Sequence, residues 1–156
     1  MDESNSTAPL SMRERNEQTT IQRIWQGAQA IYESIQVKND NFVQLILPIA
    51  GKRTCVMTIT LIEEQWVDIE PQLAFPMGTF QRTLNYPFKG MERLLRLLEA
   101  NAFIPQQKSL WTLVQNSINL LEERKNNKTR FFPMPKDYIL VKKTLKQLID
   151  LLGAIK

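Results

Sequence analysis

The chain contains no histidine and a single cysteine, and these two shortages exclude much ordinary enzyme chemistry. Without histidine there is no Ser-His-Asp or Cys-His nucleophile system, and the commonest metal ligand is missing. Cys55 alone supplies neither an intramolecular disulfide nor a structural zinc site. The five glycines are too scattered for a phosphate-binding loop or a dinucleotide fingerprint. These absences do not forbid an enzyme that uses carboxylates or a lysine, but the protein we expect is non-enzymatic, with no metal site and no cofactor.

Long apolar stretches are also lacking. No apolar run approaches the roughly 18 residues that a membrane span needs. The first twelve residues are polar and contain no apolar signal core. Together with the low cysteine content, these features predict an intracellular protein, cytoplasmic or nuclear, that is not secreted.

What the chain does contain is typical of one globular domain. It has 156 residues, of which 43% are hydrophobic and 23% are charged. A chain of this length buries enough surface to stabilise a core without disulfides. Residues 1–18 are polar and show almost no apolar periodicity, so we expect a disordered N-terminal tail. The single domain is then predicted to span residues 19–156.

The first predicted element is a helix that begins at Thr19. Thr19 and Gln22 have the spacing of a capping box, and apolar residues follow at helical intervals. The helix is expected to end near Lys38, where the sequence Lys-Asn-Asp-Asn indicates a turn. Its predicted inner stripe consists of Ile21, Ile24, Trp25, Ala28, Tyr32 and Ile35.

A β-hairpin is the clearest signal in the chain. The apolar segment 42–50 and the alternating segment 53–62 are separated by Gly51-Lys52, which suits a type II′ turn. Pro48 cannot donate to a strand ladder, so the first strand should be an edge there or contain a bulge. Residues 66–70 predict a third short strand that ends at Pro71.

The remainder of the chain is predicted to be mostly helical. Residues 71–90 are interrupted by proline and glycine, and we expect an irregular segment with a short strand near residues 79–84. Helices are predicted at 91–101, at 109–125 and from Pro135 to a stop at Gly153. The predicted fold is therefore α+β: a small antiparallel β-meander of two or three strands packed against an N-terminal helix and three C-terminal helices.

Positive charge is concentrated at the C-terminal end. Residues 1–104 contain ten basic and twelve acidic residues, whereas residues 105–156 contain ten basic and only four acidic ones. Such a bias suggests an anionic partner, because cations neutralise phosphates, and Phe131 and Phe132 would stack on bases if they were exposed. The alternative is a solubilising surface whose rings fill the core. The candidate nucleic-acid-binding residues are Arg124, Lys125, Lys128, Arg130, Lys142, Lys143 and Lys146.

A second hypothesis is a protein partner or a homo-oligomer. Aromatic residues are enriched in interfaces, and several fall within one short segment. The edge of the predicted sheet, at residues 42–50, also offers backbone groups for an added strand. The alternative is that these rings fill the space between sheet and helices. The candidate partner-binding residues are Trp66, Phe75, Phe80, Tyr86 and Phe88.

Two smaller signals complete the search for sites. Asp68 and Glu70 should point to the same side of the third strand and could hold Mg²⁺ or act as an acid–base pair. The preferred interpretation is a solvated outer face of a half-buried strand, with Val67 and Ile69 on the inner side. Cys55 falls on an apolar strand face and is interpreted as a small buried hydrophobe. Our leading hypothesis is a non-catalytic accessory subunit that docks on a larger protein assembly, with a small nucleic-acid-binding accessory protein as the alternative and an enzyme as the third choice.

Overall fold

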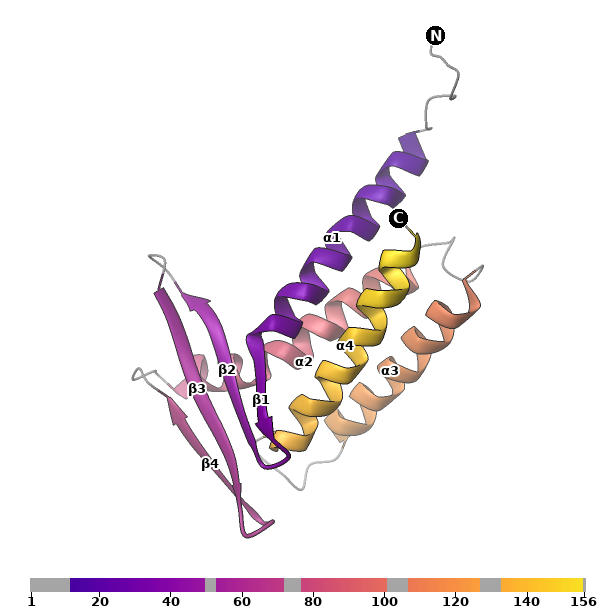
Figure 1. The fold of residues 1–156 in the computed structure, drawn as a ribbon. Helices are drawn as coiled ribbons and strands as arrows, with labels where there is room; N and C mark the ends of the chain where they lie inside the picture. The colour runs from indigo at the N-terminus through magenta and orange to yellow at the C-terminus, as the bar shows by residue number, and fades with distance from the viewer. Residues whose placement is uncertain (1–11, 50–52, 72–76, 101–106, 127–132, 156) are drawn as a thin grey trace.

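The computed structural model describes residues 12–49, 53–71, 77–100, 107–126 and 133–155 (Figure 1). Its elements follow one another in a simple order, with one helix, four strands and then three helices. The α+β fold expected from the sequence is confirmed, with a four-stranded meander. The elements are α1 (Met12–Ser34), β1 (Ile35–Asn39), β2 (Phe42–Ile49), β3 (Arg53–Ile62), β4 (Trp66–Pro71), α2 (Met77–Glu99), α3 (Lys108–Asn126) and α4 (Pro135–Ile155).

The four strands form an antiparallel sheet in the order β1-β2-β3-β4. The alternation predicted for β3 is confirmed, because Cys55, Met57 and Ile59 are all buried on one side. Val43 of β2 and Ile69 of β4 lie opposite Ile59 in register, so the inner face forms apolar rows across the strands. This face of the sheet contributes to the same hydrophobic core as the helices.

The register also settles the expectation for Pro48. Strand β1 pairs with β2 no further along than Leu45, so Pro48 has a hydrogen-bonded neighbour only in β3. The first predicted strand is therefore an edge at Pro48, as expected for a residue that lacks a backbone N–H.

Strand β1 was not predicted, because the sequence placed residues 35–38 at the end of the first helix. The structure ends α1 at Ser34, whose hydroxyl donates to the carbonyl of Ile31 over 2.6 Å. Gln36 donates from Nε2 to the carbonyl of Glu33 over 2.8 Å. These bonds satisfy carbonyls at the helix end. Ile35 is fully buried and pairs with Leu45, so the apolar residue that seemed to continue the helical stripe begins a strand instead.

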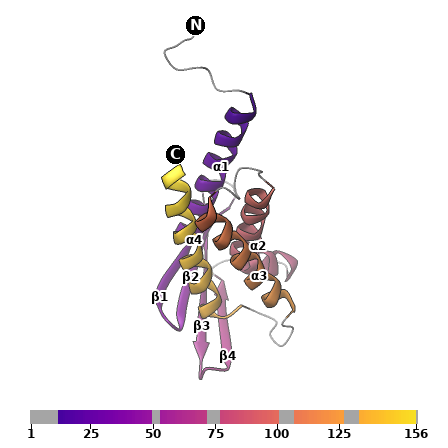
Figure 2. The same cartoon turned by 90° about the vertical axis from the view of Figure 1, so that its right-hand side faces the viewer.

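The helices lie together on one side of the molecule, next to the sheet (Figures 1 and 2). Helices α1 and α4 both pack against β1 and β2, while α1 also packs on α2, and α2 on α3. Helices α1 and α2 approach closely at two glycines. A Cβ at Gly27 would lie 3.2 Å from Leu94, and a Cβ at Gly90 would lie 2.8 Å from Ile31. The two glycines thus let the helices cross at short distance.

Helix α2 is the largest departure from the prediction. The expected irregular segment 71–90 with a strand near 79–84 is wrong for the described residues from Met77 onward, which are helical. Pro87 lies inside this helix and removes one backbone hydrogen bond. The apolar residues around it nevertheless recur at helical spacing and are buried, so packing outweighs the local cost. These buried residues are Leu84, Phe88, Met91, Leu94, Leu95 and Leu98.

The predicted starts of α3 and α4 are close to the observed ones, whereas the predicted start of α1 is not, and α4 continues past its predicted stop. Helices α3 and α4 begin within one residue of the predicted starts, but Gly153 lies inside α4 and does not stop it. Helix α1 begins at Met12, earlier than the capping box at Thr19 indicated. Residues 12–18, which were expected to belong to a disordered tail of residues 1–18, are part of α1. The rest of that tail and the turn at Gly51-Lys52 lie outside the described residues. None of the helices in the described ranges is long and apolar enough to cross a membrane.

Candidate protein-binding surface

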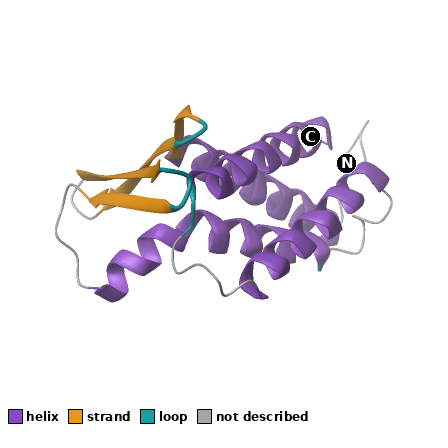
Figure 3. Ribbon diagram, turned by 90° about the horizontal axis from the view of Figure 1, so that it is seen from below, coloured by secondary structure: helices purple, strands orange, loops and turns teal. Residues whose placement is uncertain are grey.

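The sheet has a second, outer face that points away from the helical layer (Figure 3). Its residues come from the positions that alternate with the buried ones, and they are exposed or half-buried. Threonines of β3 occupy the middle of this face, with Thr58 opposite Glu70 and Thr60 opposite Asp68. Gln44 of β2 donates to the Thr58 hydroxyl over 3.4 Å.

One end of this outer face is apolar and exposed. Trp66, the first residue of β4, keeps 67% of its surface exposed, and Ile62, the last residue of β3, keeps 44%. The two residues lie directly opposite each other in the register of the hairpin. Side chains in this position are close enough to contact one another across the strands. Together they form an exposed apolar pair at the end of the β3–β4 hairpin.

The turn that connects Ile62 to Trp66 is under backbone strain. Glu63 and Glu64 have φ angles of 53° and 60°, a region that glycine and asparagine tolerate much better. The amide of Gln65 donates to the carbonyl of Ile62 over 3.2 Å and closes the turn. The connection has three residues, and the two positive φ angles at its first two positions match the twist of a hairpin. It holds two glutamates beside the Ile62–Trp66 pair.

The structure does not bring the five predicted partner-binding aromatics together. Trp66 lies at the hairpin end, whereas Tyr86 is 40% exposed on α2 and lines a cavity of about 280 Å³ near the opposite end of β3. Phe80 packs partly buried against the core, and Phe88 is buried, with its ring 4.9 Å from that of Tyr138. Phe75 lies outside the described residues. Among the four of these aromatics that the structure describes, Trp66 and Tyr86 are the exposed ones.

Ile62 was not singled out from the sequence, although a signal for it was present. Ile62 lies an even number of residues from Thr58 and Thr60 along β3, so the alternation places it on the same, polar face of the strand. An aliphatic residue on the polar side of a strand indicates an exposed contact site. The same alternation places Ile46 of β2 and Val56 of β3 on the outer face, and the register places them opposite each other.

The basic residues at the end of α3 form contacts with helix α2. The guanidinium of Arg124 lies 3.7 Å from the centre of the Phe88 ring, and its Nη2 donates to Asn85 Oδ1 over 3.3 Å. Nζ of Lys125 lies 2.6 Å from Glu92 Oε2. Both cations thus hold α3 against α2.

The basic residues of α4 contact different neighbours. Nζ of Lys142 donates to the carbonyl of Ile35 and lies 4.3 Å from the centre of the Tyr32 ring. Burial lowers the pKa of Lys142, although the nearby Glu33 opposes this effect. Nζ of Lys146 pairs with Asp150 over 3.1 Å, and Lys143 is exposed. Lys128 and Arg130 lie outside the described residues.

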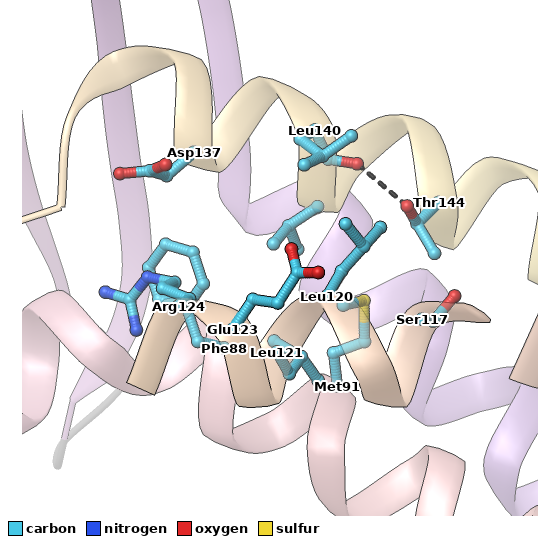
Figure 4. A pocket seen from close by; sticks show the side chains of 11 residues that line it. Phe88, Met91, Ser117, Leu120, Leu121, Glu123, Arg124, Asp137, Leu140 and Thr144 are labelled. Carbon is cyan, nitrogen blue, oxygen red and sulfur yellow. Dashed lines mark hydrogen bonds between the residues drawn. The ribbon is translucent and has the colours of Figure 1, made fainter. Parts of the chain in front are cut away.

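A groove runs between α3 and α4, with α2 beneath it (Figure 4). Its volume is about 220 Å³, and the exposed side chains of Leu120 and Leu140 lie on its two sides. Ser117 and Thr144 add buried hydroxyls, and that of Thr144 donates to the carbonyl of Leu140 over 3.0 Å. Glu123, Arg124 and Asp137 bring charges of both signs to the groove. It is mainly apolar and has no single charge sign.

The remaining candidates occupy ordinary structural positions. Asp68 and Glu70 do point to the same side of β4, as predicted, and both are exposed on the outer face. Within the described residues, no three His, Cys, Asp or Glu side chains are grouped in a way that would hold a metal ion. Cys55 is buried, and burial raises the pKa of its thiol, so the thiol stays protonated at neutral pH.

No family model, no curated protein and no solved structure matches the chain. A fold class by itself supports many unrelated functions. Function therefore has to be inferred from the surface of this chain alone.

Proposed function

We propose that the protein is a non-catalytic interaction subunit that docks on a larger protein assembly through the outer face of the β3–β4 hairpin. The observation that supports this proposal is the exposure of Trp66, at 67%, directly opposite the 44% exposed Ile62. Tryptophan is the residue most often found as an energetic anchor of protein interfaces. An aromatic and an aliphatic side chain paired in water are better explained by a partner than by the stability of the fold.

The surroundings of the pair suit an interface. Ile46 and Val56 add a second apolar pair on the same outer face, and threonines lie between the two. A central apolar contact surrounded by polar groups is the usual anatomy of such surfaces. The pair also lies on a sheet, which holds side chains in place better than a loop does.

The alternative, nucleic-acid binding, has less support from the described residues. Arg124, Lys125 and Lys142 each form contacts within the molecule, to α2 in the first two cases and to α1 and β1 in the third. A titration against DNA and RNA at roughly 50 and 200 mM salt tests this alternative, since phosphate contacts weaken steeply over that range. Salt-dependent binding that is lost on Lys143→Glu would favour it.

The proposed function is tested by comparing three forms of the protein. The wild type, a Trp66→Ala/Ile62→Thr variant and a Tyr86→Ala control are each used to recover partners from cells that express the chain. We expect one or more proteins to be recovered with the wild type and the control but not with the double variant. The control matters because Tyr86 is also an exposed ring but lies on α2, away from the hairpin end.

The double variant should leave the fold intact. Both residues are largely exposed, so their replacement should change the free energy of unfolding by no more than about 0.5 kcal/mol. Identical partners for all three forms, with the fold intact, would contradict a docking role for this face. A stable homo-oligomer that dissociates only in the double variant would identify the partner as a second copy of the chain.

A further inference from the structure

The β3–β4 hairpin is acidic as well as exposed. Between Thr54 and Gln81 the chain contains four acidic residues and no lysine or arginine. All four belong to the hairpin: two form its turn and two lie on the outer face of β4. Trp66 lies between the two groups in the sequence and keeps 67% of its surface exposed. The acidic residues are Glu63, Glu64, Asp68 and Glu70.

Strand β4 is also an edge of the sheet. It is the last strand in the order β1-β2-β3-β4 and is hydrogen-bonded only to β3 within the sheet. Every second backbone N–H and C=O of an edge strand points away from its neighbour. Along β4 the side chains alternate between exposed and half-buried, with Val67 and Ile69 on the inner side. Such an edge is a template for one further strand.

We propose that β4 accepts a basic, extended segment of a partner protein as a fifth strand; this proposal rests on the proposed function and specifies the partner. The backbone of the segment pairs with β4. Side chains of the segment that share the outer face of the sheet lie next to Asp68 and Glu70, so these positions favour lysine or arginine. A cation placed near Trp66 gains a further contact with the face of the indole ring. The intervening side chains lie beside Val67 and Ile69 and favour aliphatic residues.

The charge and the backbone groups of β4 disfavour three other partners: a second copy of the chain, a nucleic acid and an amphipathic helix. Pairing of β4 with β4 of a second copy would place Asp68 and Glu70 beside the same acidic residues, and like charges opposite each other in a sheet are destabilising. Acidic residues likewise repel nucleic-acid phosphates. An amphipathic helix would not satisfy the backbone groups of the edge. An extended basic segment satisfies both the backbone and the charge.

The probe for the test is a fluorescein-labelled peptide as long as β4, which has six residues, with lysine and valine in alternation. Two control peptides accompany it. One has glutamate in place of lysine, and the other has every backbone amide methylated, so that neither of its edges has an N–H to donate to β4. Binding to the full chain is followed by fluorescence anisotropy at roughly 50 and 200 mM salt, over which surface charge pairs are increasingly screened.

Two protein variants separate a local effect from a change in overall charge. Asp68→Lys/Glu70→Lys reverses the acidic pair on β4, whereas Glu123→Lys/Asp150→Lys makes the same change in net charge on exposed positions of α3 and α4. We expect the lysine peptide to bind the wild type and the helix variant alike. Binding to the β4 variant should be weaker by about tenfold or more, since two attractive charge pairs become repulsive.

The backbone prediction is checked by nuclear magnetic resonance. Addition of the lysine peptide should shift the amide signals of residues 66–70, and the methylated peptide should not. Equal binding of the methylated peptide would overturn strand pairing, and equal losses in the two protein variants would overturn local charge recognition. If no lysine peptide binds while a Trp66-dependent partner is still recovered, the basic-strand proposal is wrong and the proposed function stands.

Discussion

Replacing Tyr138 by phenylalanine removes one hydroxyl from the buried junction between α4 and α2. Tyr138 is fully buried, and its hydroxyl donates to the carbonyl of Leu84 over 2.7 Å. That carbonyl lies one turn before Pro87, where helix α2 lacks a backbone donor. The variant keeps the ring, whose centre lies 4.9 Å from that of the tilted Phe88 ring, and loses only the hydrogen bond. We expect the free energy of unfolding to fall by roughly 1–2 kcal/mol.

The same hydroxyl makes the stability depend on alkaline pH. Burial raises the pKa of Tyr138 far above its ordinary value. Below pH of about 10 both the folded and the unfolded chain keep the proton, so the contribution of the hydroxyl is fully present. Above that pH the unfolded chain releases the proton while the folded chain retains it. Stability is then lost by about 1.4 kcal/mol per pH unit, and phenylalanine cannot contribute to this loss.

The assay is urea unfolding of the wild type and Tyr138→Phe at pH 7 and pH 11. The difference in unfolding free energy between the two should be largest at pH 7 and should approach zero near pH 11. Tyr86→Phe serves as the control, because Tyr86 is exposed and should change the stability at neither pH. A difference that is the same at both pH values would refute the reasoning, since it would show that the Tyr138 hydroxyl ionises equally in both states.

Three further predictions concern the backbone and the thiol. Gly90→Ala should lower the free energy of unfolding by about 1 kcal/mol. The alanine Cβ would lie 2.8 Å from the buried Ile31, and this crowding outweighs the better helix propensity of alanine. Equal or higher stability in urea unfolding would contradict this. Glu63→Asn/Glu64→Gly should raise it by about 1–2 kcal/mol, since both positions have positive φ, and unchanged thermal unfolding would argue against strain there. Cys55 should not react with a thiol reagent at neutral pH until urea unfolds the chain, because the thiol is buried and protonated. Rapid labelling of the native protein would show that the thiol is accessible in the folded chain.

Segments whose own pattern was strong were predicted well. Strand β3 spans Arg53–Ile62, as its alternation indicated, and β4 covers the segment predicted from residue 66 to Pro71. Helices α3 and α4 were also recognised from apolar residues at helical spacing. In these segments local preference and final environment agree, which is the usual condition for a reliable prediction.

Strand β1 and the first part of α2, residues 77–90, were assigned wrongly because distant contacts overrode the local signal, whereas the helix predicted from residue 91 is the second part of α2. By its sequence pattern, Ile35 fits an apolar helical stripe as well as it fits a strand, and only its pairing with Leu45 makes it part of a strand. Helix α2 contains Pro87 and Gly90, which both disfavour a helix locally. The buried apolar face of α2 and its close approach to α1 at Gly90 supply the compensating stability.

The candidate site was predicted only in part, for a similar reason. Trp66 was recognised as a candidate and is exposed, but Phe88 was chosen on the same grounds and lies in the core beneath Arg124. Composition and periodicity do not tell which aromatic ring will be covered by a neighbouring element. Ile62 was missed because its importance depends on the residue opposite it in the hairpin.

The sequence by itself determined the α+β class and the position of most strands and helices. It did so because the alternation of apolar residues is a local property of each segment. It also excluded histidine-dependent chemistry, since that exclusion needs only the composition. Only the tertiary structure decided that the β3–β4 hairpin exposes Trp66 and Ile62 together and that Arg124 and Lys142 contact different neighbours. These outcomes depend on which surfaces meet after the chain folds, and that is set by long-range packing.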